Sequence, residues 1–295
     1  MAKKLTGEEL RKIEQHLIEF LKTDIGPILK NASGTKFDSY DEKVNDVDLV
    51  TVVDKKVETL IRKFAEENYP EIKFIGEESL SKDERFDLED PTFIVDPIDG
   101  TTNFIHGFPF SCTSIGVAQG GKPVIGCVYN PHLNQLFHAS LGNGAYLNDE
   151  PINIEKRTLS LKKSIIGLEG GSEREDGKGT NFTKKFDTYR KLLSDRGAFI
   201  HGFRSLGSAA MNICYVSIGY MDAYWEGGCW AWDVCAGWCI LNEAGGKIVG
   251  GNPGQWNIPI NNRSYLAVRG GLVDDDEQEK FIQDFWGFVE GALKY

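Results

Sequence analysis

Two aspartates at the end of an apolar run are the residues in this sequence best suited to chemistry. Residues 96–104 read DPIDGTTNF, so that Asp96 and Asp99 flank a proline and an isoleucine. Like charges this close repel, and a cation, backbone donors or water must compensate them. Carboxylate oxygens and a backbone carbonyl such as that of Ile98 suit Mg²⁺. Taken alone, the stretch leaves both a metal site and an ordinary capping turn open.

The residues that follow are typical of a helix beginning. Gly100 precedes Thr101, Thr102 and Asn103. The first amides of a helix lack partners within the helix and lie at the positive end of its dipole, so they favour phosphate. Oxygen ligands for a metal and free amides would then lie side by side. Together they form the two halves of a site for phosphoryl transfer.

Other carboxylates stand where predicted elements begin or end. Asp54 opens a predicted helix, Glu77 follows a short predicted strand, and Asp233 lies early in a predicted helix over 232–246. Ends of elements and loops are where functional side chains are usually carried. The spacing of an EF-hand loop, with its distal glutamate, is absent.

The elements that must position these residues come from the apolar periodicity. Capping-box spacing from Thr6 to Glu9 predicts a first helix, which Gly26 and Pro27 should kink or end, before a loop over 31–48. Alternation over 111–147 predicts an antiparallel meander. The remaining predicted strands cover 73–79, 92–100, 164–169, 198–203, 222–227, 247–250 and 264–270, and the remaining helices begin near 54, 181, 208, 232 and 275. No repeat or long linker interrupts them, so we expect one domain over 1–295 with stacked layers in an α+β (mixed α/β) fold.

Composition limits the classes of function. The chain has 295 residues and a formal net charge of -11, which argues against a nucleic-acid partner. It has no apolar run long enough for a membrane span, and its first residues are typical of a helix rather than a signal peptide. The six cysteines form no CxxC pair, so we expect reduced, buried thiols in a cytoplasmic protein.

Three motifs in order give a more specific signal than any one of them. GEES at 76–79, DPIDGTTNF at 96–104 and WDVCAG at 232–237, supported by stretches over nearly the whole chain, make the sequence resemble the inositol monophosphatase family, and its fungal members in particular. The resemblance implies a layered αβαβα sandwich, a homodimer, and Mg²⁺-dependent hydrolysis of myo-inositol monophosphates by metal-activated water.

The resemblance also implies roles for individual residues. Two or three Mg²⁺ ions are expected at Glu77, Asp96, the Ile98 carbonyl, Asp99 and Asp233. Asp54 and Thr101 correspond to the pair that orients and deprotonates the attacking water. Substrate binding is implied for Ile98, Asp99, Gly100, Thr101, Gly207, Ser208, Ala209, Glu226 and Asp233. The family often has threonine where this chain has Ser208, and little effect is expected because both carry a hydroxyl.

Related activities stay open beside this one. Li⁺ is expected to inhibit by replacing one Mg²⁺. Relatives that cut inositol polyphosphates, fructose bisphosphate or 3'-phosphoadenosine phosphates would need extra basic residues, for which Arg204 and Lys43 are the nearest candidates. From another class, a metal-binding regulatory module without catalysis would be expected to have lost at least one of the acidic residues or Thr101, and all are present.

Overall fold

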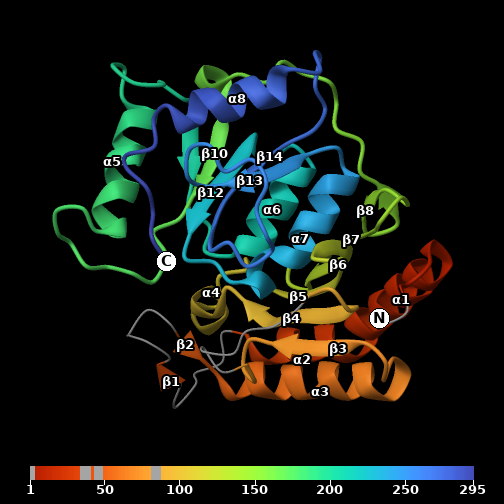
Figure 1. Cartoon of the computed structure of the whole chain (residues 1–295). Coiled ribbons are helices and arrows are strands. Elements are labelled where there is room, and N and C mark those ends of the chain that lie inside the picture. The colour runs from red at the N-terminus through yellow and green to blue at the C-terminus, as the bar shows by residue number, and fades with distance from the viewer. Residues whose placement is uncertain (1–3, 34–40, 43–48, 81–87) are drawn as a thin grey trace.

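The computed structural model describes residues 4–33, 41–42, 49–80 and 88–295, and these build five layers of helix, sheet, helix, sheet and helix (Figure 1). Helices α2 (Gly26–Ala32) and α3 (Val52–Asn68) cover the outer face of one sheet, and α6 (Ala209–Ser217) and α7 (Ala231–Glu243) lie between the sheets. Helices α5 (Asn181–Leu193) and α8 (Glu277–Trp286) cover the other outer face. The predicted mixed α/β fold with αβαβα layers is confirmed.

Within the described residues the first sheet has seven strands in chain order. They are β3 (Lys73–Gly76), β4 (Thr92–Asp99), β5 (Cys112–Gln119), β6 (Lys122–Asn130), β7 (Gln135–Ser140), β8 (Ala145–Leu147) and β9 (Glu150–Pro151). Strands β3 and β4 are parallel, and every later pair is antiparallel; β5 to β8 form the antiparallel meander that the alternation over 111–147 predicted. Because β3 and β4 run parallel, their carboxyl ends meet at one edge and bring Glu77 near Asp96.

The second sheet has five strands among the described residues, in the order β11 (Gly202–Arg204), β10 (Ile165–Leu168), β12 (Ala223–Gly227), β14 (Ser264–Val268) and β13 (Lys247–Gly250). The strand expected over 198–203 is shorter and begins at Gly202. Strands β10 and β12 are parallel, with Leu168 opposite Trp225. Their ends therefore place Glu169 beside Glu226, although 56 residues of sequence lie between the two carboxylates.

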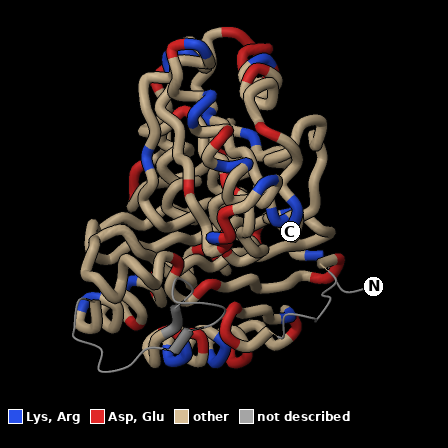
Figure 2. Tube along the Cα trace, turned by 90° about the vertical axis from the view of Figure 1, so that its left-hand side faces the viewer, with Lys and Arg blue, Asp and Glu red and all other residues tan. Residues whose placement is uncertain are grey.

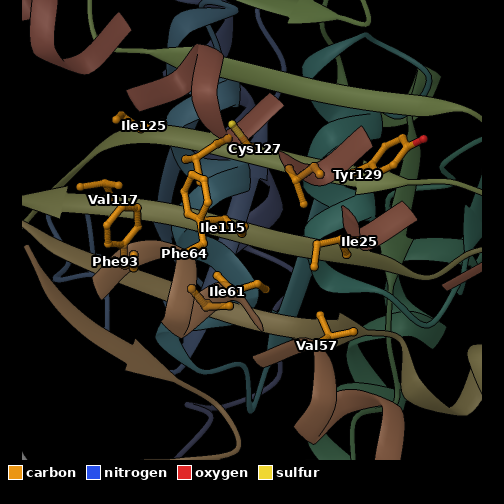
Figure 3. Packing of buried hydrophobic residues seen from close by; sticks show 14 of the residues in the cluster. Ile25, Val57, Ile61, Phe64, Phe93, Ile115, Val117, Ile125, Cys127 and Tyr129 are labelled. Atoms are coloured by element: carbon orange, nitrogen blue, oxygen red, sulfur yellow. The ribbon is translucent and has the colours of Figure 1, made fainter. Parts of the chain in front are cut away.

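An apolar core fixes the first sheet against the N-terminal helices. Helix α1 (Gly7–Phe20) and α3 face strands β4 to β7, and Phe64, Phe93, Ile115 and Val117 interlock between them (Figure 3). Fully burying a side chain of this size contributes about 1.5–3 kcal/mol. The packed core holds β4 rigidly, and the acidic turn at its end is thereby held in place.

The first helical region differs from the prediction at Gly26 and Pro27. The α-helix ends at Phe20, a π-helical turn covers Leu21–Ile25, and α2 then continues to Ala32. Pro27 lies in the first turn of α2, where its missing N–H has no cost. A Cβ on Gly26 would lie 2.7 Å from the Tyr129 ring, so glycine allows the close approach. The predicted loop over 31–48 lies largely outside the described residues; within that range α2 covers 31–32 and Asp41–Glu42 form β1, which pairs with β2 (Leu49–Val50).

Charged residues of both signs are interspersed along the described chain (Figure 2). None of the helices in the described ranges combines the length and the apolar character needed to cross a bilayer. The six cysteines all lie in the described ranges, and each is buried with a free thiol.

Candidate active site

A break in strand pairing aims both aspartates of β4 at one place. Asp96 pairs with Ser114 and Asp99 with Cys112, so three steps along β4 face two along β5. In a regular strand residues three apart point to opposite faces, and such a register shift re-aims one of them. The Ile98 N–H donates to Oδ1 of Asp96 over 3.0 Å and stabilises the turn.

A third carboxylate completes an oxygen cluster. Asp233 lies in the first turn of α7, where its Oδ2 accepts the Trp230 N–H over 2.6 Å. Within the described residues, ligand atoms of Asp96, Asp99 and Asp233 lie within 4.8 Å of one another. Burial and the charge of Glu77 raise the pKa of Asp99 to about 6, and burial and the charge of Asp99 raise the pKa of Asp233 well above its usual range. Buried carboxylates with raised pKa values and hard oxygen donors fit a divalent cation such as Mg²⁺.

Glu77 lies beside this cluster. It follows β3 directly, is partly buried, and lines the same cavity as the three aspartates. Its negative charge raises the pKa values of Asp99 and Asp233. Among the described residues, the three aspartates form the group whose ligand oxygens lie close together, and Glu77 lines the cavity wall beside them.

Asp54 and Thr101 are brought together from elements 47 residues apart. Thr101 is the first residue of α4 (Thr101–His106), and its hydroxyl lies 3.2 Å from Oδ1 of Asp54 and 3.0 Å from the Ile98 carbonyl. Oδ2 of Asp54 accepts the Thr51 N–H over 2.9 Å and the Thr51 hydroxyl, in the capping box of α3. The cap fixes the carboxylate, so the threonine hydroxyl meets a rigid acceptor.

Gly100 adopts a conformation that favours glycine. Its φ is 87°, and a Cβ there would lie 3.0 Å from the carbonyl oxygens of Gly207 and Phe110. The side-chain amide of Asn103 holds the same two segments together, since it donates to the carbonyls of Phe110 over 2.8 Å and Leu206 over 2.7 Å. The start of α4 therefore packs directly against the segment before α6.

The predicted substrate residues of α6 contact the metal-ligand candidate in this structure. The Ser208 hydroxyl donates to Oδ2 of Asp99 over 2.7 Å, and the Ala209 amide donates to Oδ1 over 3.3 Å. The Ala210 amide adds a bond of 2.6 Å. Ser208 and Ala209, which were expected to face substrate, thus hold Asp99 together with Ala210. Gly207, Ser208 and Ala209 nevertheless all line the cavity.

The cavity that joins these groups has a volume of about 540 Å³. Glu226 lines it at the end of β12, and its carboxylate accepts the Tyr224 hydroxyl. Burial, followed by the charge of Glu169, raises the pKa of Glu226 to about 7. The predicted metal, catalytic and substrate residues therefore surround one space, except that Asp54 reaches it through Thr101. The described lining residues include all of the others: Glu77, Asp96, Ile98, Asp99, Gly100, Thr101, Gly207, Ser208, Ala209, Glu226 and Asp233.

Sequence reasoning missed Glu169. This buried carboxylate accepts hydrogen bonds from the backbone N–H groups of Leu206 and Gly207 over 2.6 and 2.8 Å. It also accepts the Ser205 hydroxyl over 2.7 Å and the side-chain amide of Asn212 over 2.9 Å. It thereby shapes the segment that precedes α6. The pairing of β10 with β12 could have indicated it, but that pairing has no local signature.

The expected basic residues near the cavity also need correction. Arg204 lies exposed on the edge strand β11, where its Nη1 donates to the Phe203 carbonyl over 2.8 Å, and it is not among the described cavity-lining residues. Lys43 lies outside the described residues. Arg174 lines the cavity instead, and its Nε donates to the Gly171 carbonyl over 2.7 Å.

Comparisons with known proteins agree with this geometry. The model of the inositol monophosphatase family matches residues 9–290. The chain is 61% identical to inositol monophosphatase 2 of Saccharomyces cerevisiae over 291 residues, which is 99% of each protein. It is 52% identical to inositol monophosphatase 1 of the same yeast over 295 residues, 97% of this chain and 99% of the relative. The solved structure of extragenic suppressor protein suhB from Bartonella henselae superposes with a TM-score of 0.77 at 27% identity, covering 95% of this chain and 100% of that one. The chain therefore belongs to the inositol monophosphatase family.

Proposed function

We propose that this protein hydrolyses myo-inositol monophosphates to myo-inositol and phosphate, with Mg²⁺ as cofactor. One observation carries the proposal: the cluster of Asp96, Asp99 and Asp233 opens into the same cavity as the Thr101 hydroxyl and the Glu226 carboxylate. A metal site, a group that can orient water and an acceptor for hydroxyls thus adjoin one another.

The residues proposed to hold two or three Mg²⁺ ions are Glu77, Asp96, Asp99, Asp233 and the Ile98 carbonyl. When bound, Mg²⁺ neutralises phosphate charge and makes a coordinated water more acidic. The raised pKa values of Asp99 and Asp233 support this role, because a bound cation would offset both the burial and the repulsion that raise them.

The proposed catalytic pair is Asp54 and Thr101. The Thr101 hydroxyl can donate its proton to Asp54, whose carboxylate is held by the α3 cap, and can then accept a hydrogen bond from the attacking water. This chain of bonds orients a lone pair of the water toward phosphorus. The amides of Gly100 and Thr101, at the beginning of α4, are proposed to bind phosphate oxygens.

The leaving group is proposed to occupy the part of the cavity between α6 and β12. Glu226 offers acceptor oxygens for ring hydroxyls, and Gly207, Ser208 and Ala209 line the opposite wall. Glu169 and Glu226 supply acceptor oxygens at this wall, and Arg174 is the one basic side chain among the described lining residues, which favours a neutral polyol over a leaving group with further phosphates.

The family supports four further proposals. Li⁺ inhibits turnover, and the protein is a homodimer. Each chain forms one domain, and the protein acts in the cytoplasm. The buried free thiols agree with a reducing compartment. Sedimentation equilibrium tests the dimer, and a fluorescent fusion imaged in cells tests the location.

The experiment that tests the function measures phosphate release from inositol 1-phosphate, fructose 1,6-bisphosphate and 3'-phosphoadenosine 5'-phosphate. Each is assayed with and without Mg²⁺ and Li⁺. We expect Mg²⁺-dependent, Li⁺-blocked turnover that is highest for the inositol ester. Preference for another ester would retain the metal site but refute the assignment of the polyol pocket. Absence of turnover with all three would favour a metal-binding regulatory protein.

A further inference from the structure

Behind the cavity wall that Glu169 and Glu226 line, there is a buried lysine that no sequence motif singled out. Lys185 projects inward from α5 and is only 1% exposed. Its Nζ donates to the Gly227 carbonyl over 2.7 Å and to the Gly170 carbonyl over 3.2 Å. A buried ammonium is costly unless it is paired, so its position calls for a compensating negative group.

The compensating group is Glu226. Among the charges acting on Lys185, that of Glu226 has the largest effect, and it counters the fall in the pKa of the lysine that burial causes. In return, Lys185 counters the rise in the pKa of Glu226. A Cβ built on Gly171 would lie 2.7 Å from Nζ of Lys185 and 3.9 Å from Oε1 of Glu226, so both groups adjoin the same glycine.

The two carbonyls that Lys185 binds lie at the carboxyl ends of two neighbouring parallel strands, β10 and β12. Gly170 follows β10 through Glu169, and Gly227 ends β12 after Glu226. The ammonium therefore links the segments that carry the carboxylates of Glu169 and Glu226. The Tyr295 ring, 5.6 Å from Nζ, lies over the same place and limits its exposure to water.

We propose that Lys185 is a positioning residue for substrate specificity, which ties the ends of β10 and β12 together and holds Glu226 as an acceptor for a hydroxyl of the leaving group. The inference rests on the proposed function. It identifies a residue outside the cavity lining that determines the preference of the active site for a polyol leaving group. Lys185 itself does not contact the substrate: it acts through the carboxylate that does.

A double-mutant cycle tests this role. Lys185→Met, Glu226→Gln and the double variant are assayed with inositol 1-phosphate at saturating Mg²⁺. We expect K185M to raise KM about tenfold, because the misplaced Glu226 carboxylate loses its charge-assisted hydrogen bond to a substrate hydroxyl. The same variant should change kcat less than about twofold. In the E226Q background the same substitution should change KM less than about twofold, because the group that it positions is already altered.

The neighbouring Lys184 provides the matched control. It lies on the same helix, and its Nζ donates to the Ala292 carbonyl over 2.7 Å, away from the cavity lining. Lys184→Met should leave KM and kcat within about twofold of wild type. Thermal unfolding of all variants shows which of them are folded.

Each result decides between the alternatives. Effects of K185M and E226Q on log KM that simply add, or an unchanged KM in K185M, would overturn the role of Lys185. If K185M does not fold, Lys185→Gln keeps a donor for the carbonyls without the charge, and the cycle is measured with that variant. Failure of both to fold would show that the lysine serves the fold alone, and would also overturn the proposal. Lack of wild-type turnover of the inositol ester refutes the proposed function instead, and is seen before any variant is assayed.

Discussion

The Ser208 hydroxyl donates a hydrogen bond to Oδ2 of Asp99 over 2.7 Å, and so joins the end of β4 to the beginning of α6. Ser208 is also the N-cap of α6, where its side chain accepts the Met211 N–H over 3.3 Å. Burial raises the pKa of Asp99, and the bonds from Ser208 and Ala210 oppose that rise. One serine therefore stabilises a helix and favours the ionised form of a proposed metal ligand.

Ser208→Ala should weaken both the helix and the metal site. Loss of an N-cap side chain costs about 1 kcal/mol of stability. Loss of the bond to Asp99 should raise the pKa of that carboxyl further, so that more Mg²⁺ is needed for half-maximal activity. Ser208→Thr keeps the hydroxyl and should behave like wild type. Thermal unfolding and Mg²⁺ titration of phosphate release measure the two effects, and equal behaviour of the alanine and threonine variants would contradict this account.

Asp99→Asn should nearly abolish turnover while the protein stays folded. Asparagine keeps one oxygen that can accept the Ser208 hydroxyl and the Ala210 N–H, but it loses the acceptor of the longer bond from Ala209 and removes the charge that a divalent cation needs. A loss of several kcal/mol of electrostatic stabilisation corresponds to about a thousandfold in rate. Without metal, the variant should be about as stable as wild type, because the cost of burying the charge and its repulsion with Glu77 and Asp233 are relieved, which offsets the lost bond from Ala209. Phosphate release and thermal unfolding check both statements, with Asp149→Asn at an exposed carboxylate as control. Wild-type activity in D99N would rule out its role in the metal site.

Local patterns were sufficient to predict the elements that carry the aspartates. The apolar stretch before Asp96 is β4, and the predicted helix after Trp230 is α7, because burial periodicity and caps are encoded within a few neighbouring residues. Stacked layers followed from the succession of elements, but the αβαβα arrangement came from the family resemblance, since the order of strands within a sheet has no such local signature.

The missed residues depend on contacts distant in sequence. Glu169 and Lys185 reach the pocket wall only because β10 pairs in parallel with β12 and α5 packs behind them. Arg204, by contrast, is close to Gly207 in sequence, yet its side chain lies exposed on an edge strand. Proximity in sequence was therefore a poor guide to the charges around the cavity, although the motifs located its acidic end.

Thr101→Val should lower kcat without unfolding the protein. Valine retains the shape of threonine but cannot donate to Asp54 or accept from water, and losing a positioned acid–base group typically costs about 10²- to 10⁴-fold in rate. Thr101→Ser keeps the hydroxyl and should retain most of the activity. KM should change little in both, since the hydroxyl acts on the water. Steady-state kinetics separates the parameters, and a valine variant as active as the serine variant would exclude a role for the hydroxyl.

In metal-free protein, stability should fall as the pH rises from about 4.5 to about 7. Burial and the charge of Glu169 raise the pKa of Glu226 from 4.5 to about 7, so the folded state holds a proton that the unfolded state releases. The stabilisation from protonated Glu226 is therefore complete below its pKa in the unfolded chain, and it is lost as the pH rises through its pKa in the folded protein. At 1.36 kcal/mol per pKa unit, the loss is roughly 3 kcal/mol.

Glu226→Gln isolates this contribution, because glutamine cannot ionise. Denaturant unfolding in EDTA across this pH range should give E226Q a flatter dependence of the free energy of unfolding than wild type shows. Asp99 and Asp233, whose pKa values are also raised, should leave a residual slope of the same sign. Glu150→Gln, at an exposed position on β9, should follow wild type. Equal slopes for wild type and E226Q would mean that Glu226 ionises as freely in the folded protein as in the unfolded chain, and that the wall facing the polyol is open to water.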